Sequence, residues 1–80
     1  MVIKRSAAKE IEALPQKDRA RVIERIRGLA EDPRPVGCKK LSKEEKYRVR
    51  QRRYRILYQI EDAELIVTVV KVGHRINVYE

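Results

Sequence analysis

The chain has 80 residues, of which 20 are Lys or Arg and 12 are Asp or Glu, so its formal net charge is +8 at pH 7. A chain of this length is predicted to form one domain, residues 1–80, with a thin core, which disfavours chemistry that needs a deep internal cavity. The excess of positive charge attracts polyanions and makes nucleic acid the leading partner class.

The first predicted elements are a short strand and a helix. Residues 1–5 are apolar enough for an edge strand, and Ser6 is placed to cap the helix that follows, because its hydroxyl can accept a backbone N–H bond. The apolar side chains of this helix are spaced by four and three residues: Ala7, Ile11 and Leu14. Pro15 should end the helix, since proline disfavours the helical conformation in the preceding residue.

A second helix is predicted from about Gln16 to Ala30 and should end at Asp32-Pro33. Its apolar stripe consists of Ile23, Ile26 and Ala30, widened by Val22 and Leu29. Because the connection at Pro15 is short, the two helices should pack nearly antiparallel. The arginines on the charged outer faces are interpreted as solvated surface without a catalytic role: Arg19, Arg21, Arg25 and Arg27.

Residues 33–45 contain Pro, Gly and polar side chains and are predicted to form a connecting loop. Cys38 lies in this loop; as the single cysteine it cannot form an internal disulfide, and it is interpreted as a reduced thiol. No apolar run is long enough for a signal peptide or a membrane span. We therefore expect a cytoplasmic protein without a membrane partner.

From Lys46 onward apolar residues recur at every second position, which is typical of strands. A hairpin is expected, with strands at residues 46–50 and 54–60 joined by a turn at residues 51–53. Tyr47 and Val49 should then face the core.

A third strand is predicted over residues 64–72, after a tight connection at Asp62-Ala63. Its β-branched residues indicate a strand covered on both faces, and Gly73 should allow a bend after it. This order predicts an α+β fold: an N-terminal helical hairpin packs on one face of a small, mainly antiparallel sheet (β-α-α-β-β-β).

The strand alternation also separates charge from core. If Tyr47 and Val49 face the helices, Arg48 and Arg50 must point to the opposite side of the sheet. Residues 39–55 hold nine basic and two acidic side chains, and therefore seven of the eight units of net charge. The free face of the sheet should be strongly electropositive.

In combination, these segments resemble the toxins of bacterial and archaeal type II toxin–antitoxin modules in the RelE/ParE superfamily. The resemblance covers nearly the whole chain, in order. The stretches that carry it are Ser6-Ala-Ala-Lys-Glu10, the Leu14-Pro15 break, Tyr47-Arg-Val-Arg50, Tyr54-Arg-Ile-Leu-Tyr58 with Glu61-Asp62, and Val70-Lys-Val-Gly-His-Arg75 followed by Val78-Tyr79.

The resemblance implies a RelE-like fold and a RelE-like mRNA interferase: a metal-independent endoribonuclease that cuts messenger RNA in the ribosomal A site and inhibits translation. It implies no cofactor, and one His and one Cys cannot assemble a usual zinc site. The expected partners are the ribosome, mRNA and a cognate RelB-like antitoxin, whose acidic segment would wrap the toxin. The toxin alone is expected to be monomeric.

The family's catalytic positions correspond to Arg48, Arg50, Arg55, Arg75 and Tyr79. Arg55 and Arg75 are expected to clamp the scissile phosphate, because a planar guanidinium donates two bonds to phosphate oxygens. Tyr79 is expected to stack on a base or exchange a proton. Ribonuclease members often have lysine where this chain has Arg48 and Arg50; arginine keeps charge stabilisation but is no plausible general base.

Other cations are expected to contact ribosomal RNA phosphates without reading sequence: Lys39, Lys40, Lys43, Lys46, Arg52, Arg53 and Lys71. His74 is a further acid–base candidate, since imidazole titrates near neutral pH, but strand alternation would turn it away from Arg75. The family commonly has glycine in the hairpin turn, where this chain has Gln51-Arg-Arg53.

Two other functions stay open at this point. A ParE-type toxin, which inhibits DNA gyrase through protein contacts, shares the fold and the early motifs, and only the retained Arg75 and Tyr79 favour the nuclease. An inactive relative that only binds antitoxin is also compatible with the lysine-to-arginine departures.

Overall fold

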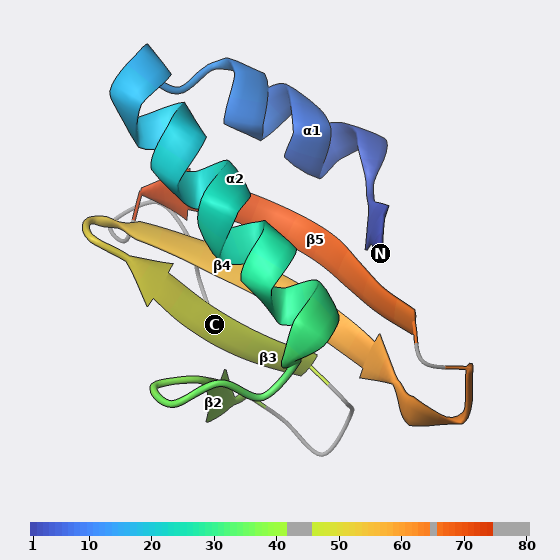
Figure 1. Ribbon diagram of the computed structural model, residues 1–80. Coiled ribbons are helices and arrows are strands. Elements are labelled where there is room, and N and C mark those ends of the chain that lie inside the picture. Colours follow the sequence, from blue (N-terminus) through green and yellow to red (C-terminus); the bar gives the residue numbers. More distant parts are fainter. Residues whose placement is uncertain (42–45, 65, 75–80) are drawn as a thin grey trace.

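The computed structural model describes residues 1–41, 46–64 and 66–74 (Figure 1). Its elements, in chain order, are strand β1 (Val2–Ile3), helices α1 (Arg5–Glu12) and α2 (Gln16–Glu31), strands β2 (Lys39–Lys40), β3 (Lys46–Gln51) and β4 (Tyr54–Glu61), the 3₁₀ turn η1 (Asp62–Glu64) and strand β5 (Ile66–His74). The described strands form one sheet in the order β1-β5-β4-β3-β2, with β1 parallel to β5 and the other neighbours antiparallel. The predicted α+β fold is confirmed.

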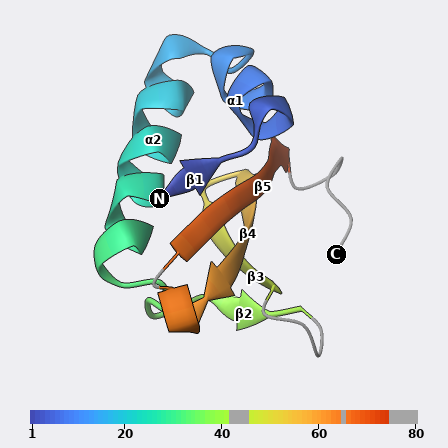
Figure 2. The same cartoon turned by 90° about the vertical axis from the view of Figure 1, so that its right-hand side faces the viewer.

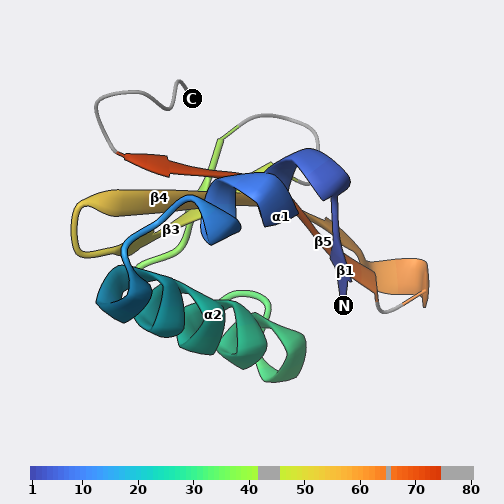
Figure 3. The same ribbon diagram turned by 90° about the horizontal axis from the view of Figure 1, so that it is seen from above.

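The core lies between the helices and one face of the sheet, and Figures 2 and 3 show α2 running along that face. Each helix buries one stripe of side chains: Ala7 and Ile11 from α1, and Val22, Ile26 and Leu29 from α2. The sheet adds alternate residues of β3 and β4 and, on β5, residues on both sides of a register shift: Tyr47, Val49, Tyr54, Ile56, Tyr58, Ile60, Val67, Val69 and Val72. The predicted inward positions of Tyr47 and Val49 are confirmed. Neither described helix is long and apolar enough to cross a membrane.

The predicted cap of the first helix is wrong. The helix starts at Arg5, Lys4 occupies the N-cap position, and no side chain caps it. Pairing of β1 with β5 explains this start: the Lys4 N–H donates to the Val69 carbonyl, and the Lys4 carbonyl already accepts the Ala8 N–H. The chain therefore passes directly from strand to helix, and Ser6 lies within the first turn.

The second helix has the predicted bounds to within one residue, but its buried stripe differs. Val22, Ile26 and Leu29 are buried, whereas Ile23 is half-buried and Ala30 is exposed. The predicted loop also contains a strand, because β2 pairs with β3 in antiparallel register. Its two exposed lysines carry no apolar pattern that would have indicated a strand.

Strand β5 begins at Ile66, because residues 62–64 form η1, and continues to His74. The predicted bend at Gly73 is wrong, since Gly73 pairs with Arg55 within the strand. The expectation that β5 is covered on both faces is also wrong. Its buried residues lie on the helix side, and Ile66 and Thr68 on the other side remain half-buried.

Candidate functional site

The side of the sheet opposite the helices carries a group of basic residues that we call the cationic face: Lys39, Lys46, Arg48, Arg50, Arg55 and Lys71. Strand register fixes this arrangement, because residues paired on neighbouring strands point to the same side of a sheet. Arg50 is paired with Arg55, and Arg48 is paired with Lys39 on one side and Leu57 on the other. The three arginines therefore occupy adjacent positions on β3 and β4.

Arg48 is buried although it lies on the open side of the sheet, with only 8% of its surface exposed. Its strand, β3, is paired with β2 on one side and with β4 on the other. Burial lowers the pKa of Arg48 below its ordinary value, and the charges of Arg50 and Arg55 lower it further. These surroundings make the charged form of Arg48 less stable than it would be in water, and an approaching anion would stabilise it.

Arg50 is exposed and Arg55 is half-buried, and the two are directly opposite each other. On its other side Arg55 is paired with Gly73, which has no side chain. Like charges at directly opposed positions destabilise a sheet. An anion that contacts both guanidinium groups would turn this repulsion into attraction.

The cations predicted to dock on RNA surround these arginines. Lys39 and Lys40 are exposed on β2, Lys46 is exposed at the start of β3, and Arg52 and Arg53 form the exposed turn between β3 and β4. Lys40 is paired with Tyr47 and is therefore on the opposite side of β2 from Lys39. Three predicted site residues, Lys43, Arg75 and Tyr79, lie outside the described residues.

Lys71 differs from the other predicted docking residues because it is held by an acidic side chain. Its Nζ lies 2.9 Å from Oε2 of Glu10 in α1, and the Val72 N–H donates to Oε1 of the same carboxylate over 3.2 Å. Glu10 thus fixes Lys71 and satisfies a backbone donor of β5. Lys71 can reach an RNA phosphate only by exchanging this ion pair.

His74 is placed away from the cationic face. It is paired with Tyr54, whose side chain belongs to the core, and the two rings meet edge to face with centroids 6.1 Å apart. The Tyr54 hydroxyl donates to Asp18 of α2 over 2.7 Å, and this bond raises the pKa of Tyr54. The surroundings of His74 are those of a packed residue on the helix side.

A cluster around Arg34, absent from the predictions, joins the loop after α2 to the sheet. The Arg34 Nη1 and Nη2 donate to the Asp62 carboxylate at 3.1 and 2.9 Å, and its Nε donates to the Tyr47 hydroxyl at 3.1 Å. The guanidinium also lies 5.1 Å from the centre of the Tyr47 ring, which stacks on Tyr58. Tyr58 completes the cluster by donating to the Pro33 carbonyl. These contacts fix the start of β3, where the cationic face begins.

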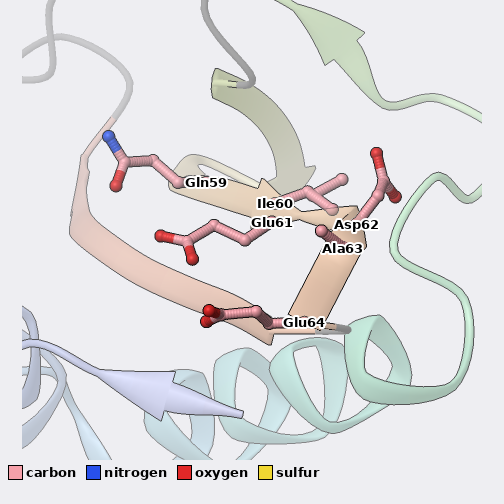
Figure 4. Close-up of a pocket in the computed structure, with 6 residues that line it drawn as sticks. All are labelled: Gln59, Ile60, Glu61, Asp62, Ala63 and Glu64. Carbon is pink, nitrogen blue, oxygen red and sulfur yellow. The ribbon is translucent and has the colours of Figure 1, made fainter.

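A pocket at the far end of the sheet is lined by residues 59–64. Figure 4 shows the carboxylates of Glu61 and Glu64 extending to the same side, with Asp62 turned away from them. Asp62 is bound to Arg34, whose hydrogen bonds, together with its positive charge, lower the pKa of the Asp62 carboxyl. The acidic lining makes this end of the molecule unsuitable for a polyanion.

Comparison with known proteins identifies the fold and the family. A model of the family described as the ParE toxin of the type II toxin–antitoxin system parDE matches residues 1–79. A search of curated proteins finds no sequence match. Among solved structures, the isolated RelE toxin of E. coli is 27% identical with a TM-score of 0.80, and the match covers 91% of this chain and 80% of that one.

Two toxin–antitoxin complexes are equally similar in fold. The RelBE2 complex of Mycobacterium tuberculosis is 29% identical, with a TM-score of 0.79 and coverage of 91% of this chain and 93% of that one. The archaeal RelE–RelB complex of Pyrococcus horikoshii has a TM-score of 0.83 at 23% identity, covering 95% and 93%. The chain therefore belongs to the ParE toxin family and is a type II toxin–antitoxin toxin of the RelE/ParE superfamily.

Proposed function

We propose that this toxin is a ribosome-dependent, metal-independent endoribonuclease that cuts mRNA in the ribosomal A site and so inhibits translation. The observation that carries the proposal is the position of Arg48, Arg50 and Arg55 on one face of the sheet, with Arg48 buried beside two like charges. Three guanidinium groups at adjacent positions offer a phosphate several charge-assisted N–H donors.

Cleavage of RNA without a metal requires three tasks. The 2′-hydroxyl must lose its proton, the extra negative charge on the pentacoordinate phosphorus must be stabilised, and the leaving 5′-oxygen must gain a proton or an equivalent stabilisation. Arg55 and Arg75 are proposed to clamp the scissile phosphate through paired N–H donors. Arg48 and Arg50 add positive charge where the transition state becomes more negative.

Proton transfer needs a different kind of side chain, because an arginine is no practical base. Tyr79 is proposed to stack on a base next to the cut and to exchange a proton there. The packing of His74 against Tyr54 favours a structural role for that imidazole.

The other cations predicted to dock on RNA are proposed to contact ribosomal RNA phosphates: Lys39, Lys40, Lys43, Lys46, Arg52, Arg53 and Lys71. An antitoxin of the RelB type, with an acidic segment that wraps the toxin and neutralises the cationic face, is proposed as the partner that silences it. The toxin without its antitoxin is proposed to be a monomer in the cytoplasm.

The test is primer-extension mapping of an mRNA with purified toxin, on programmed ribosomes and free in solution. Cuts are expected only on ribosomes, and Arg55→Ala and Arg75→Ala should each reduce cutting about 100-fold or more, as expected for loss of a transition-state donor. Lys9→Ala removes an exposed charge on α1 and serves as the control that should cut normally. Undiminished cutting by both arginine variants would refute the assignment.

A ParE-type action on DNA gyrase is the second candidate, because the matched family model is described as a ParE toxin. It predicts gyrase-dependent DNA breakage, growth restored by a resistant gyrase, and no cuts on ribosomes. An antitoxin-binding regulator without activity would show neither effect and would not be toxic when expressed alone.

A further inference from the structure

A second group of arginines lies on the helix side of the sheet, apart from the cationic face. Arg21, Arg25 and Gly28 are spaced by four and three residues on one face of α2, and with Glu24 and with Gln51, the last residue of β3, they line a shallow pocket. Space is available beside Gly28, because apart from its chain neighbours and the backbone of its own helix no atom lies within 4 Å of where a Cβ would be.

The two arginines of this pocket have no anionic partner among the described residues. The Arg25 Nε is buried without a hydrogen-bond acceptor. The carboxylate that lines the pocket, Glu24, is paired with an arginine that does not line it: its Oε2 lies 3.9 Å from Nη1 of Arg27. Two like charges four residues apart destabilise a helix, and buried N–H donors are rarely left unsatisfied.

We propose that this pocket binds a phosphate group of the RNA backbone and forms a second docking point of the toxin on the ribosome. The inference rests on the proposed function and extends it to α2. Guanidinium groups suit phosphate, since their N–H donors match its oxygens in pairs.

Two features favour RNA over a protein partner. The pocket is lined by charged and polar side chains and Gly28, so it offers no large apolar anchor of the kind that protein interfaces need. It also adjoins the β3–β4 turn through Gln51, so Arg52 and Arg53 connect it to the cationic face around the end of the hairpin. A phosphate backbone could follow this band from one side of the sheet to the other.

The first experiment measures the Kd of the toxin for 70S ribosomes with an empty A site at several salt concentrations. Arg21→Ala/Arg25→Ala should raise the Kd about tenfold and reduce the slope of log K against log salt by roughly 0.7 to 0.9, which is the expected effect of losing one phosphate contact. Lys9→Ala/Lys17→Ala removes the same charge from other exposed helix positions and should change the slope much less. An identical slope for the two double variants would overturn the proposal.

A charge change of opposite sign sharpens the test. Glu24→Gln should tighten ribosome binding about two- to threefold. The variant removes the repulsion between one surface carboxylate and the RNA phosphates. At saturating ribosomes all these variants should cut mRNA at the wild-type rate, because α2 lies on the opposite side of the sheet from Arg55. A large loss of cutting rate at saturation, with no change in Kd, would count against a docking role.

A third measurement does not depend on cleavage or on ribosomes. Inorganic phosphate added to the free protein should shift the Arg25 Nε–H signal in a ¹H–¹⁵N spectrum at lower concentration than acetate does, and should leave Arg27 nearly unchanged. No shift with phosphate, or a stronger response to acetate as expected for a protein carboxylate, would refute the site. If ribosomal cutting failed while this shift and the Kd effects persisted, only the nuclease assignment would be lost.

Discussion

At the scale of single residues, the hairpin turn shows a conflict between local stability and charge. Arg52 has φ of 55°, in the left-handed region that costs a non-glycine residue about 1 kcal/mol, whereas Arg53 keeps a negative φ. Arg52→Gly is therefore expected to raise the free energy of unfolding by about 1 kcal/mol in urea titrations. Arg53→Gly, the control, should lower it. Equal destabilisation by both changes would show that the turn is unstrained.

The pair formed by Arg50 and Arg55 is a second conflict at this scale. Replacing Arg50 with Gln removes a like charge directly opposite Arg55, so the free energy of unfolding should rise by about 0.5 kcal/mol. Cutting on ribosomes should nevertheless fall, because the same charge is proposed to stabilise the transition state. Lys17→Gln should alter neither quantity. Loss of stability in Arg50→Gln would mean that Arg50 supports the sheet.

At the scale of elements, the ion pair between Arg34 and Asp62 connects the loop after α2 with η1. Arg34 lowers the pKa of Asp62 in the folded state, so the pair stabilises the fold above the unfolded pKa of about 4, and this stabilisation is lost as pH falls through the folded pKa. Asp62→Asn should therefore be less stable than wild type at neutral pH and match it in strong acid. Urea titrations across this range, with Glu31→Gln as the control, measure the difference. A constant difference at every pH would exclude the electrostatic explanation.

The elements that the sequence predicted correctly are those with a strong local period. The α2 bounds and the alternation of Tyr47, Val49 and Tyr54 are local properties, and they were enough to place Arg48 and Arg50 on the open face. The start of α1 and the existence of β2 depend instead on pairing with distant strands. Local sequence does not contain that information.

The same limit applies to the candidate site. Arg34 and Asp62 are 28 residues apart, and Glu10 and Lys71 are 61 residues apart, so neither contact follows from spacing or composition. The burial of Arg48 was equally hidden, because alternation places it on the open side of the sheet, where an exposed side chain is expected. Side-chain alternation shows the direction of a residue but not what covers it.

At the scale of the whole molecule, charge is distributed unevenly, with the cationic face and the hairpin end at one side and the acidic pocket of residues 59–64 at the other. The net charge of +8 makes the compact free protein repel itself, and at 0.1 M salt the repulsion between charges more than about 10 Å apart is largely screened. The same salt competes with phosphate contacts on RNA.

Salt is therefore expected to act on stability and on ribosome binding in opposite directions. Raising NaCl from about 0.02 M to about 0.2 M should increase the melting temperature of the free toxin by screening the like charges around Arg48, while the Kd for ribosomes rises steeply. Arg50→Gln should show a smaller gain in melting temperature and a shallower binding slope, whereas Lys17→Gln should resemble wild type. A lower melting temperature of the wild-type protein in high salt would mean that repulsion between like charges on the cationic face contributes little to its stability. The argument that a bound anion relieves this repulsion would then fail.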